Sequence, residues 1–127
     1  MRALVCHKIT DDLSGVEGRE IEKPTPGPGE VLVKVAATSI NFPDILLCQG
    51  KYQLKLEPPF TPGMDIAGII EAVGEGVDGF GVGDAGCGGA RFGGFAEYAV
   101  VAAAGLQRKP EQLSFHEAAS YSAAYLT

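Results

Sequence analysis

The stretch that decides the fold runs from Pro26 to Ile40 and reads P-G-P-G-E-V-L-V-K-V-A-A-T-S-I. Its first four residues are turn formers, which end any regular element before them. Residues 30–40, which follow, are rich in β-branched side chains and contain neither glycine nor proline. A run of this kind, bounded by turn signals, predicts a β-strand.

The segments on either side of this strand predict further strands. Runs of apolar and β-branched residues bounded by turn formers lie at 2–8, 16–22, 65–74 and 94–102. Glycine accounts for 18 of the 127 residues, and 12 of these lie between Gly63 and Gly94. Such clustering favours turns and close backbone approaches over long helices. Gly68, inside one predicted strand, indicates a bulge or a close crossing of two chains.

Two segments predict helices. Residues 42–48 allow about two helical turns, because Pro43 is tolerated at the start of a helix. Ser114 and Glu117 match the S-x-x-E capping box, so we expect a second helix from about 115 to Thr127. In the first helix, Phe42, Ile45 and Leu46 are assigned to the core. The whole pattern predicts a mainly β barrel or sandwich with two helices.

Composition argues against several classes of function. The net charge is −6 and the charges are interleaved, so nucleic acid is not expected as a partner. No apolar run approaches the ~20 residues that a membrane helix needs, so no membrane partner is expected. Three widely spaced cysteines indicate free thiols in a reducing, cytoplasmic setting.

Two patterns that resemble ligand sites are better explained by structure. The segments 74–79 and 81–86 both fit G-x-G-x-x-G, but no helix follows to hold a pyrophosphate, so we predict turns between strands. The candidate metal ligands contain neither C-x-x-C nor a histidine pair, so no metal site is predicted; they are Cys6, His7, Cys48, Cys87 and His116. Cys48 is interpreted as a small buried apolar residue.

Eight motifs occur in the order found in one enzyme family. They are P-G-P-G-E-V-L-V-K-V at 26–35, I-N-F-P-D at 40–44, Q-G-K-Y at 49–52, P-F-T-P-G-M-D-I-A-G at 59–68, V-G-E-G-V at 73–77, V-G-D at 82–84, G-G-F-A-E-Y at 93–98 and L-S-F-H-E-A-A at 113–119. Together they resemble the N-terminal, GroES-like catalytic domain of the medium-chain dehydrogenase/reductase superfamily, in its zinc-free quinone oxidoreductase branch. The resemblance implies a GroES-like, partly open β-barrel over residues 1–127. After Gly83–Asp84 the sequence departs from the family, which weakens the expectation of a strand near 85–90.

The resemblance also implies a chemistry. Hydride passes from NADPH to a quinone or activated alkene, in a cleft between this domain and a Rossmann domain. Asn41 and Tyr52 are the implied catalytic residues, and they bind the cofactor together with Thr127. Asp44, Thr61 and Met64 are implied to line the substrate cleft. Zinc-dependent relatives place a cysteine ligand near Asn41 and a histidine ligand at Met64, so no zinc is expected here.

Three of these residues have a structural alternative. Asparagine is a frequent N-cap residue, so Asn41 would cap the helix at 42–48. Asp44, in the first turn, would interact favourably with the helix dipole. Tyr52 would pack its ring on the barrel and leave its hydroxyl in water.

The implied enzyme is longer than this chain. The Rossmann domain and a C-terminal return segment would follow Thr127, so we expect a fragment that is inactive alone and prone to self-association. The complete enzyme is expected to be a homodimer. One alternative is an enoyl or alkenal reductase of the same superfamily, and another is a non-catalytic GroES-like binding module.

Overall fold

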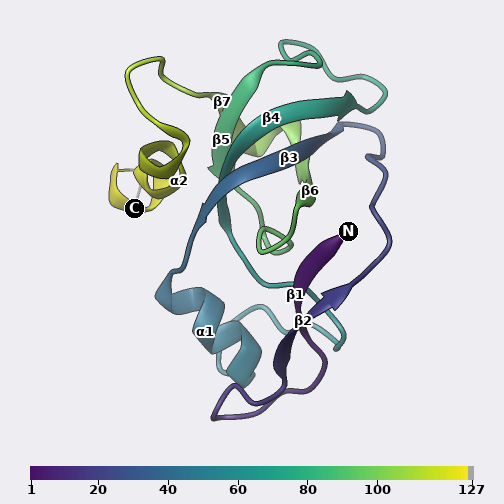
Figure 1. Cartoon of the computed structure of the whole chain (residues 1–127), viewed down its shortest axis with the longest axis vertical. Coiled ribbons are helices and arrows are strands. Elements are labelled where there is room, and N and C mark those ends of the chain that lie inside the picture. The colour runs from purple at the N-terminus through teal and green to yellow at the C-terminus, as the bar shows by residue number, and fades with distance from the viewer. Residues whose placement is uncertain (126–127) are drawn as a thin grey trace.

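The computed structural model describes the backbone of residues 1–125 and the side chains of residues 1–120 (Figure 1). The strands are β1 (Arg2–Cys6), β2 (Val16–Glu20), β3 (Glu30–Ser39), β4 (Asp65–Val73), β5 (Ala85–Gly89), β6 (Tyr98–Ala102) and β7 (Leu106–Arg108). The helices are α1 (Phe42–Gln49), the short 3-10 turn η1 (Ala103–Gly105) and α2 (Phe115–Tyr125). The fold is therefore mainly β with two helices, as predicted. No helix of the described residues is long and apolar enough to cross a membrane.

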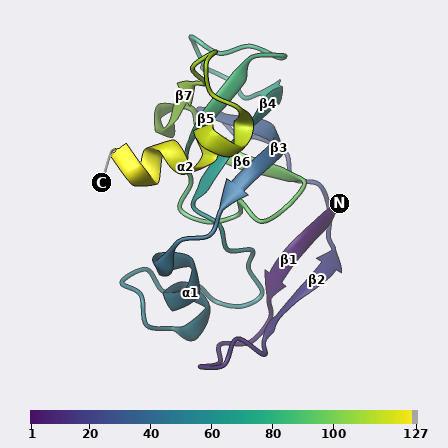
Figure 2. The ribbon, with the colours of Figure 1, turned by 60° about the vertical axis from the view of Figure 1, so that its left-hand side comes forward.

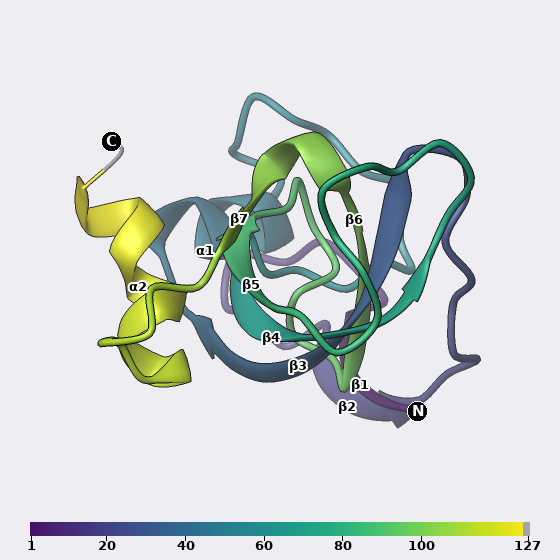
Figure 3. The same cartoon turned by 90° about the horizontal axis from the view of Figure 1, so that it is seen from above.

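The long strand β3 lies between β6 and β4 in a five-stranded antiparallel sheet. The strand order is β6-β3-β4-β5-β7, and η1 joins the two edge strands. Seen from above, the sheet curls into a barrel (Figure 3). The side chains of Val31, Val33, Ile66 and Ile70 are fully buried inside it. The β-branched run therefore forms a strand because both of its neighbours are strands and its apolar face fills the barrel.

Gly68 lies at a close approach of β4 to β3. The pairing register shifts between Val35 and Ala37, directly opposite Gly68 and Ala67. A Cβ atom on Gly68 would lie 2.1 Å from the carbonyl oxygen of Lys34. The predicted bulge or close crossing is confirmed, because only a residue without Cβ fits there.

The hairpin β1–β2 and helix α1 form the lower part of the molecule in Figure 1. Cys6 and Phe60 exchange two backbone hydrogen bonds, of 2.7 and 3.1 Å, and pack with Leu47 and Cys48 of α1. The buried position predicted for Cys48 is confirmed. The core assignment of Phe42 is wrong, since 69% of this residue is exposed. With 3.6 residues per turn, Phe42 lies on the opposite side of α1 from Leu47 and Cys48.

Helix α2 covers the outer side of β3, β4 and β5 (Figure 2). Small residues meet at this contact: Ala118 and Ala119 of the helix pack on Ala37, Ala67 and Cys87 of the sheet. The predicted capping box is present. The amide of Glu117 donates to Ser114 Oγ at 3.1 Å, and the amide of Ser114 donates to Glu117 Oε1 at 2.9 Å.

Two expectations about the glycine-rich region are wrong. Residues 85–89 form β5, which pairs with β4 and β7 despite their glycines. Gly88 lets the chains approach closely, since a Cβ there would lie 2.3 Å from the Gly105 carbonyl oxygen. The strand predicted at 94–102 begins only at Tyr98. Residues 93–95 instead donate their amides to the carbonyls of residues 61–63, and these bonds join two loops.

Candidate functional site

The loop between β3 and α1 holds Asn41 at the N-cap of α1. Its backbone amide donates to Asp44 Oδ2 at 2.8 Å, and the Asp44 amide donates to the Asn41 carbonyl oxygen at 3.0 Å. The side-chain nitrogen of Asn41 donates to Asp65 Oδ2 at 2.5 Å and to Ser39 Oγ at 3.3 Å. Asn41 therefore connects the end of β3, the start of α1 and the start of β4.

Asp44 lies inside the protein and not on an open wall. Only 2% of the residue is exposed. Its Oδ1 atom is buried and has no hydrogen-bond partner of ordinary geometry in the described residues. Burial raises the pKa of this carboxyl group and the charge of Asp65 adds to the rise, while the amides of Asn41, Gly63 and Met64 oppose it. Asp44 thus ties the start of α1 to the loop that precedes β4.

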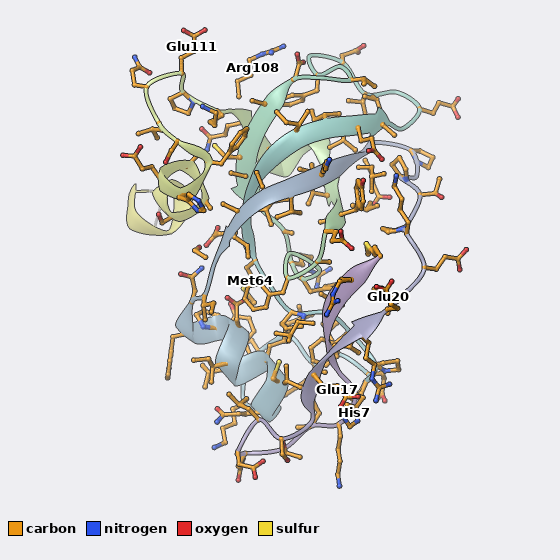
Figure 4. All side chains as sticks on the ribbon, viewed as in Figure 1. His7, Glu17, Glu20, Met64, Arg108 and Glu111 are labelled. Atoms are coloured by element: carbon orange, nitrogen blue, oxygen red, sulfur yellow. The ribbon has the colours of Figure 1, made fainter. Side chains whose placement is uncertain are left out.

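Tyr52 and Met64 meet in one pocket of about 340 Å³. The other lining residues are Gln53, Leu54, Ala90 and Arg91. Met64 lies between α1 and the barrel strands (Figure 4). Tyr52 is half-buried against the cluster around Cys6 and Leu47, so its ring packs and still reaches the pocket. A volume near ~300 Å³ is at the lower end of the range for small-molecule sites.

Arg91 is the charged residue of this pocket, and the sequence did not indicate it. Its guanidinium is exposed, and it forms no ion pair with any residue in the described part of the chain. The only sign of this role in the sequence is a single arginine inside a glycine-rich segment, which is a weak indication of a ligand site. Its place beside Tyr52 gives the pocket a positive charge.

Thr61 faces a different pocket. It lines a mainly apolar pocket of about 350 Å³ together with Phe60 and Phe92, among others. The carbonyl oxygen of Thr61 accepts a hydrogen bond of 2.7 Å from the Gly93 amide. The structure therefore brings Tyr52 and Met64 together, and places Thr61 apart from them. Thr127 lies outside the described residues.

The sequence model of the alcohol dehydrogenase GroES-like domain matches residues 27–111. This match covers more than half of the chain. The chain belongs to this family. The assignment to the medium-chain dehydrogenase/reductase superfamily is thereby confirmed.

Relatives of this GroES-like domain include proteins of several names. A zinc-type alcohol dehydrogenase-like protein of Schizosaccharomyces pombe is 39% identical over 94% of the chain and 42% of its own length. The human quinone oxidoreductase is 38% identical over 85% of the chain and 33% of its own length. The quinone oxidoreductase of Thermus thermophilus, whose structure was solved alone and with NADPH, is 32% identical with a TM-score of 0.82. The match covers 100% of the present chain and 38% of the Thermus thermophilus chain. The chain thus spans less than half the length of these relatives.

The GroES-like domain shows no cluster of metal ligands among its described residues. No three side chains of His, Cys, Asp or Glu come together there in a way that could hold an ion. The two positions at which zinc-dependent relatives carry a ligand are Asn41 and Met64. The Asn41 amide donates a hydrogen bond to Asp65, and the Met64 thioether lines the pocket with Tyr52.

The buried Asp44 and the half-buried Asp65 of the GroES-like domain predict a pH dependence of stability. Burial raises the pKa of both Asp44 and Asp65, and the Asn41 side chain partly opposes this for Asp65. Each group then holds its proton more tightly in the folded chain than in the unfolded chain, where the pKa is about 3.9. Their contribution to the free energy of unfolding therefore falls as pH rises from this unfolded value through the raised folded value.

The variant Asp65→Asn isolates this contribution. It removes one of the two groups and lowers the pKa of Asp44 by removing a neighbouring negative charge. We expect its free energy of unfolding, minus that of the wild type, to increase as pH rises through that window. Urea unfolding at a series of pH values measures the difference. A difference that does not change with pH would show that neither carboxyl group titrates abnormally.

Proposed function

We propose that this chain is the N-terminal domain of an NADPH-dependent oxidoreductase that reduces a quinone or another activated alkene. One observation carries the proposal. In a domain related to quinone oxidoreductases, Tyr52 and Met64 line a common pocket near the loop that Asn41 organises. A Rossmann domain and a return segment complete the enzyme beyond the present 127 residues.

The described residues fit the reacting end of the cofactor and not its phosphates. The glycines at 74–79 form a turn after β4, and no helix begins there to hold a pyrophosphate. Near the pocket, Tyr52 offers a hydroxyl donor and Asn41 a side-chain carbonyl oxygen. NADPH supplies the hydride when bound, and one proton from solvent or a donor completes the reduction of a quinone to a hydroquinone.

The chain's own residues perform the other tasks. The Tyr52 hydroxyl donates a hydrogen bond to the acceptor oxygen, on which negative charge develops during reduction. Met64 and Leu54 give the pocket apolar walls, which exclude water around the acceptor. A quinone accepts hydride without a metal, so this domain needs no zinc for the reaction.

The test uses the enzyme expressed with its Rossmann domain. NADPH oxidation is followed with a panel of quinones, enones and alkenals, which also separates the proposed quinone reductase from an enoyl or alkenal reductase. Tyr52→Phe removes only the hydroxyl. We expect a loss of roughly 10- to 100-fold in kcat/KM, as for one hydrogen bond to a charged group. Tyr98→Phe, outside this pocket, is the matched control and retains activity.

Two outcomes contradict the proposal at different levels. A folded enzyme that oxidises NADPH with none of these acceptors is better explained as a non-catalytic binding module. Full activity of Tyr52→Phe shows that Tyr52 only packs. The 127-residue chain by itself is expected to show no turnover and no micromolar binding when it is titrated with NADPH.

A further inference from the structure

The amide of Asn41 has a defined orientation. Its nitrogen carries two protons, and both have acceptors: Asp65 Oδ2 at 2.5 Å and Ser39 Oγ at 3.3 Å. An ionised carboxylate only accepts hydrogen bonds, so the amide nitrogen, and not its oxygen, must face Asp65. The carboxylate of Asp65 therefore decides which end of the Asn41 side chain points inward.

The acceptors are themselves held in place. The Ser39 hydroxyl donates to the carbonyl oxygen of Ala119 in α2 at 3.1 Å, which leaves its lone pairs for Asn41. The Thr38 hydroxyl donates to the backbone oxygen of Asp65 at 2.6 Å. Strand β3 and helix α2 thus support the two groups that bind the Asn41 nitrogen, so the amide cannot rotate without breaking these bonds.

The oxygen of the Asn41 amide can accept one more hydrogen bond. It takes the capping-box position toward the Asp44 amide, which also donates to the backbone oxygen of Asn41 at 3.0 Å. The carbonyl oxygen of an amide has two lone pairs, so it can accept a second hydrogen bond beside this contact. Asn41 is half-buried and the neighbouring Ile40 and Phe42 are 75% and 69% exposed, so a ligand can approach this loop.

We propose that Asp65 is a positioning residue that turns the Asn41 nitrogen inward, so that Asn41 presents only an acceptor oxygen to a ligand. The ligand group must then be a hydrogen-bond donor. This step rests on the proposed function, and the available donors are the carboxamide N–H of the nicotinamide and a hydroxyl of its ribose. A quinone carbonyl has no proton to donate, so Asn41 serves the cofactor and not the acceptor.

The orientation is tested on the 127-residue chain by nuclear magnetic resonance of the Asn41 side-chain NH₂ group. We expect a downfield proton that follows the titration of Asp65 in the wild type. Asp65→Asn abolishes this pH dependence, because the replacement amide does not titrate. Asp44 is the other titrating group in contact, and the backbone amide of Asn41 reports on it separately. Asp84→Asn is the matched control, because the carboxylate of Asp84 accepts a hydrogen bond from the Gly81 amide and not from Asn41. An unchanged titration of the Asn41 NH₂ signals in Asp65→Asn would overturn the proposal.

The ligand class is tested kinetically in the complete enzyme. Asp65→Asn can pair with Asn41 in either orientation, so we expect KM for NADPH to rise roughly three- to tenfold with little change in kcat, as for one lost hydrogen bond. The same comparison is made with the 3-acetylpyridine analogue of NADPH, which lacks the carboxamide N–H. If the rise disappears with the analogue, the donor is the carboxamide, and if it persists, the donor is a ribose hydroxyl.

The two proposals fail in different ways. An unchanged KM for both cofactors in Asp65→Asn overturns the positioning role while the wild type still oxidises NADPH. A wild-type enzyme without any NADPH oxidation overturns the proposed function and the assigned ligand class. The orientation of Asn41 is then still decided by the magnetic resonance experiment.

Discussion

Replacing Gly68 with alanine is expected to lower the free energy of unfolding by about 3 kcal/mol or more, a large part of a domain's usual stability. The new Cβ would lie 2.1 Å from the Lys34 carbonyl oxygen and 2.9 Å from Val33 Cγ1. The first contact is with the backbone of β3, which lies between β4 and β6 and cannot move away without breaking its pairing with them. Relief therefore requires opening the sheet at a buried position.

The measurement is urea unfolding followed by far-ultraviolet circular dichroism. Gly18→Ala is the matched control, because Gly18 is an exposed strand residue in β2 and a Cβ there meets nothing within 4 Å. We expect the control to change stability by less than about 0.5 kcal/mol. Equal stability of the two variants would mean that β3 and β4 do not cross at Gly68.

The elements that could be predicted are those whose signal lies in consecutive residues. Residues 30–39 form β3 because β-branched side chains favour a strand wherever that segment is placed. Residues 85–89 carry no such signal, since A-G-C-G-G has little side chain to pack. They form β5 only because β4 and β7 supply hydrogen bonds from far along the chain. That pairing depends on tertiary structure and could not be predicted locally.

The candidate site divides in the same way. The N-cap position of Asn41 follows from a local pattern, and its structural alternative as a capping residue describes its backbone contacts well. Asp65 was not singled out, because an acid at the start of an apolar strand is an ordinary strand end. Its role depends on contact with Asn41, 24 residues earlier in the chain. The proximity of Tyr52 and Met64 likewise follows from the fold of the loop between them.

Removing the carboxyl group of Asp44 is the other change for which we expect a large loss of stability. Asp44→Ala leaves the half-buried amide of Asn41 without its acceptor at 2.8 Å and takes a negative group from beside the Gly63 and Met64 amides. A lost cap and an unpaired half-buried donor together cost about 2 to 3 kcal/mol. Relief of a buried charge offsets part of this at neutral pH, since burial raises the pKa of Asp44.

Glu117→Ala is the matched control, because Glu117 has the same position in the capping box of α2 and also binds a backbone amide, that of Ser114, at 2.9 Å. Glu117 is exposed, so water replaces its carboxylate and the loss of stability is clearly smaller. The two variants separate the effect of burial from that of capping. The deficit of Asp44→Ala should also grow as pH falls toward about 4, because the protonated, buried Asp44 stabilises the folded wild type most there. Urea unfolding of both variants at neutral and acidic pH measures these differences. Equal losses in the two variants, or a deficit that shrinks in acid, would show that Asp44 acts only as an ordinary helix cap.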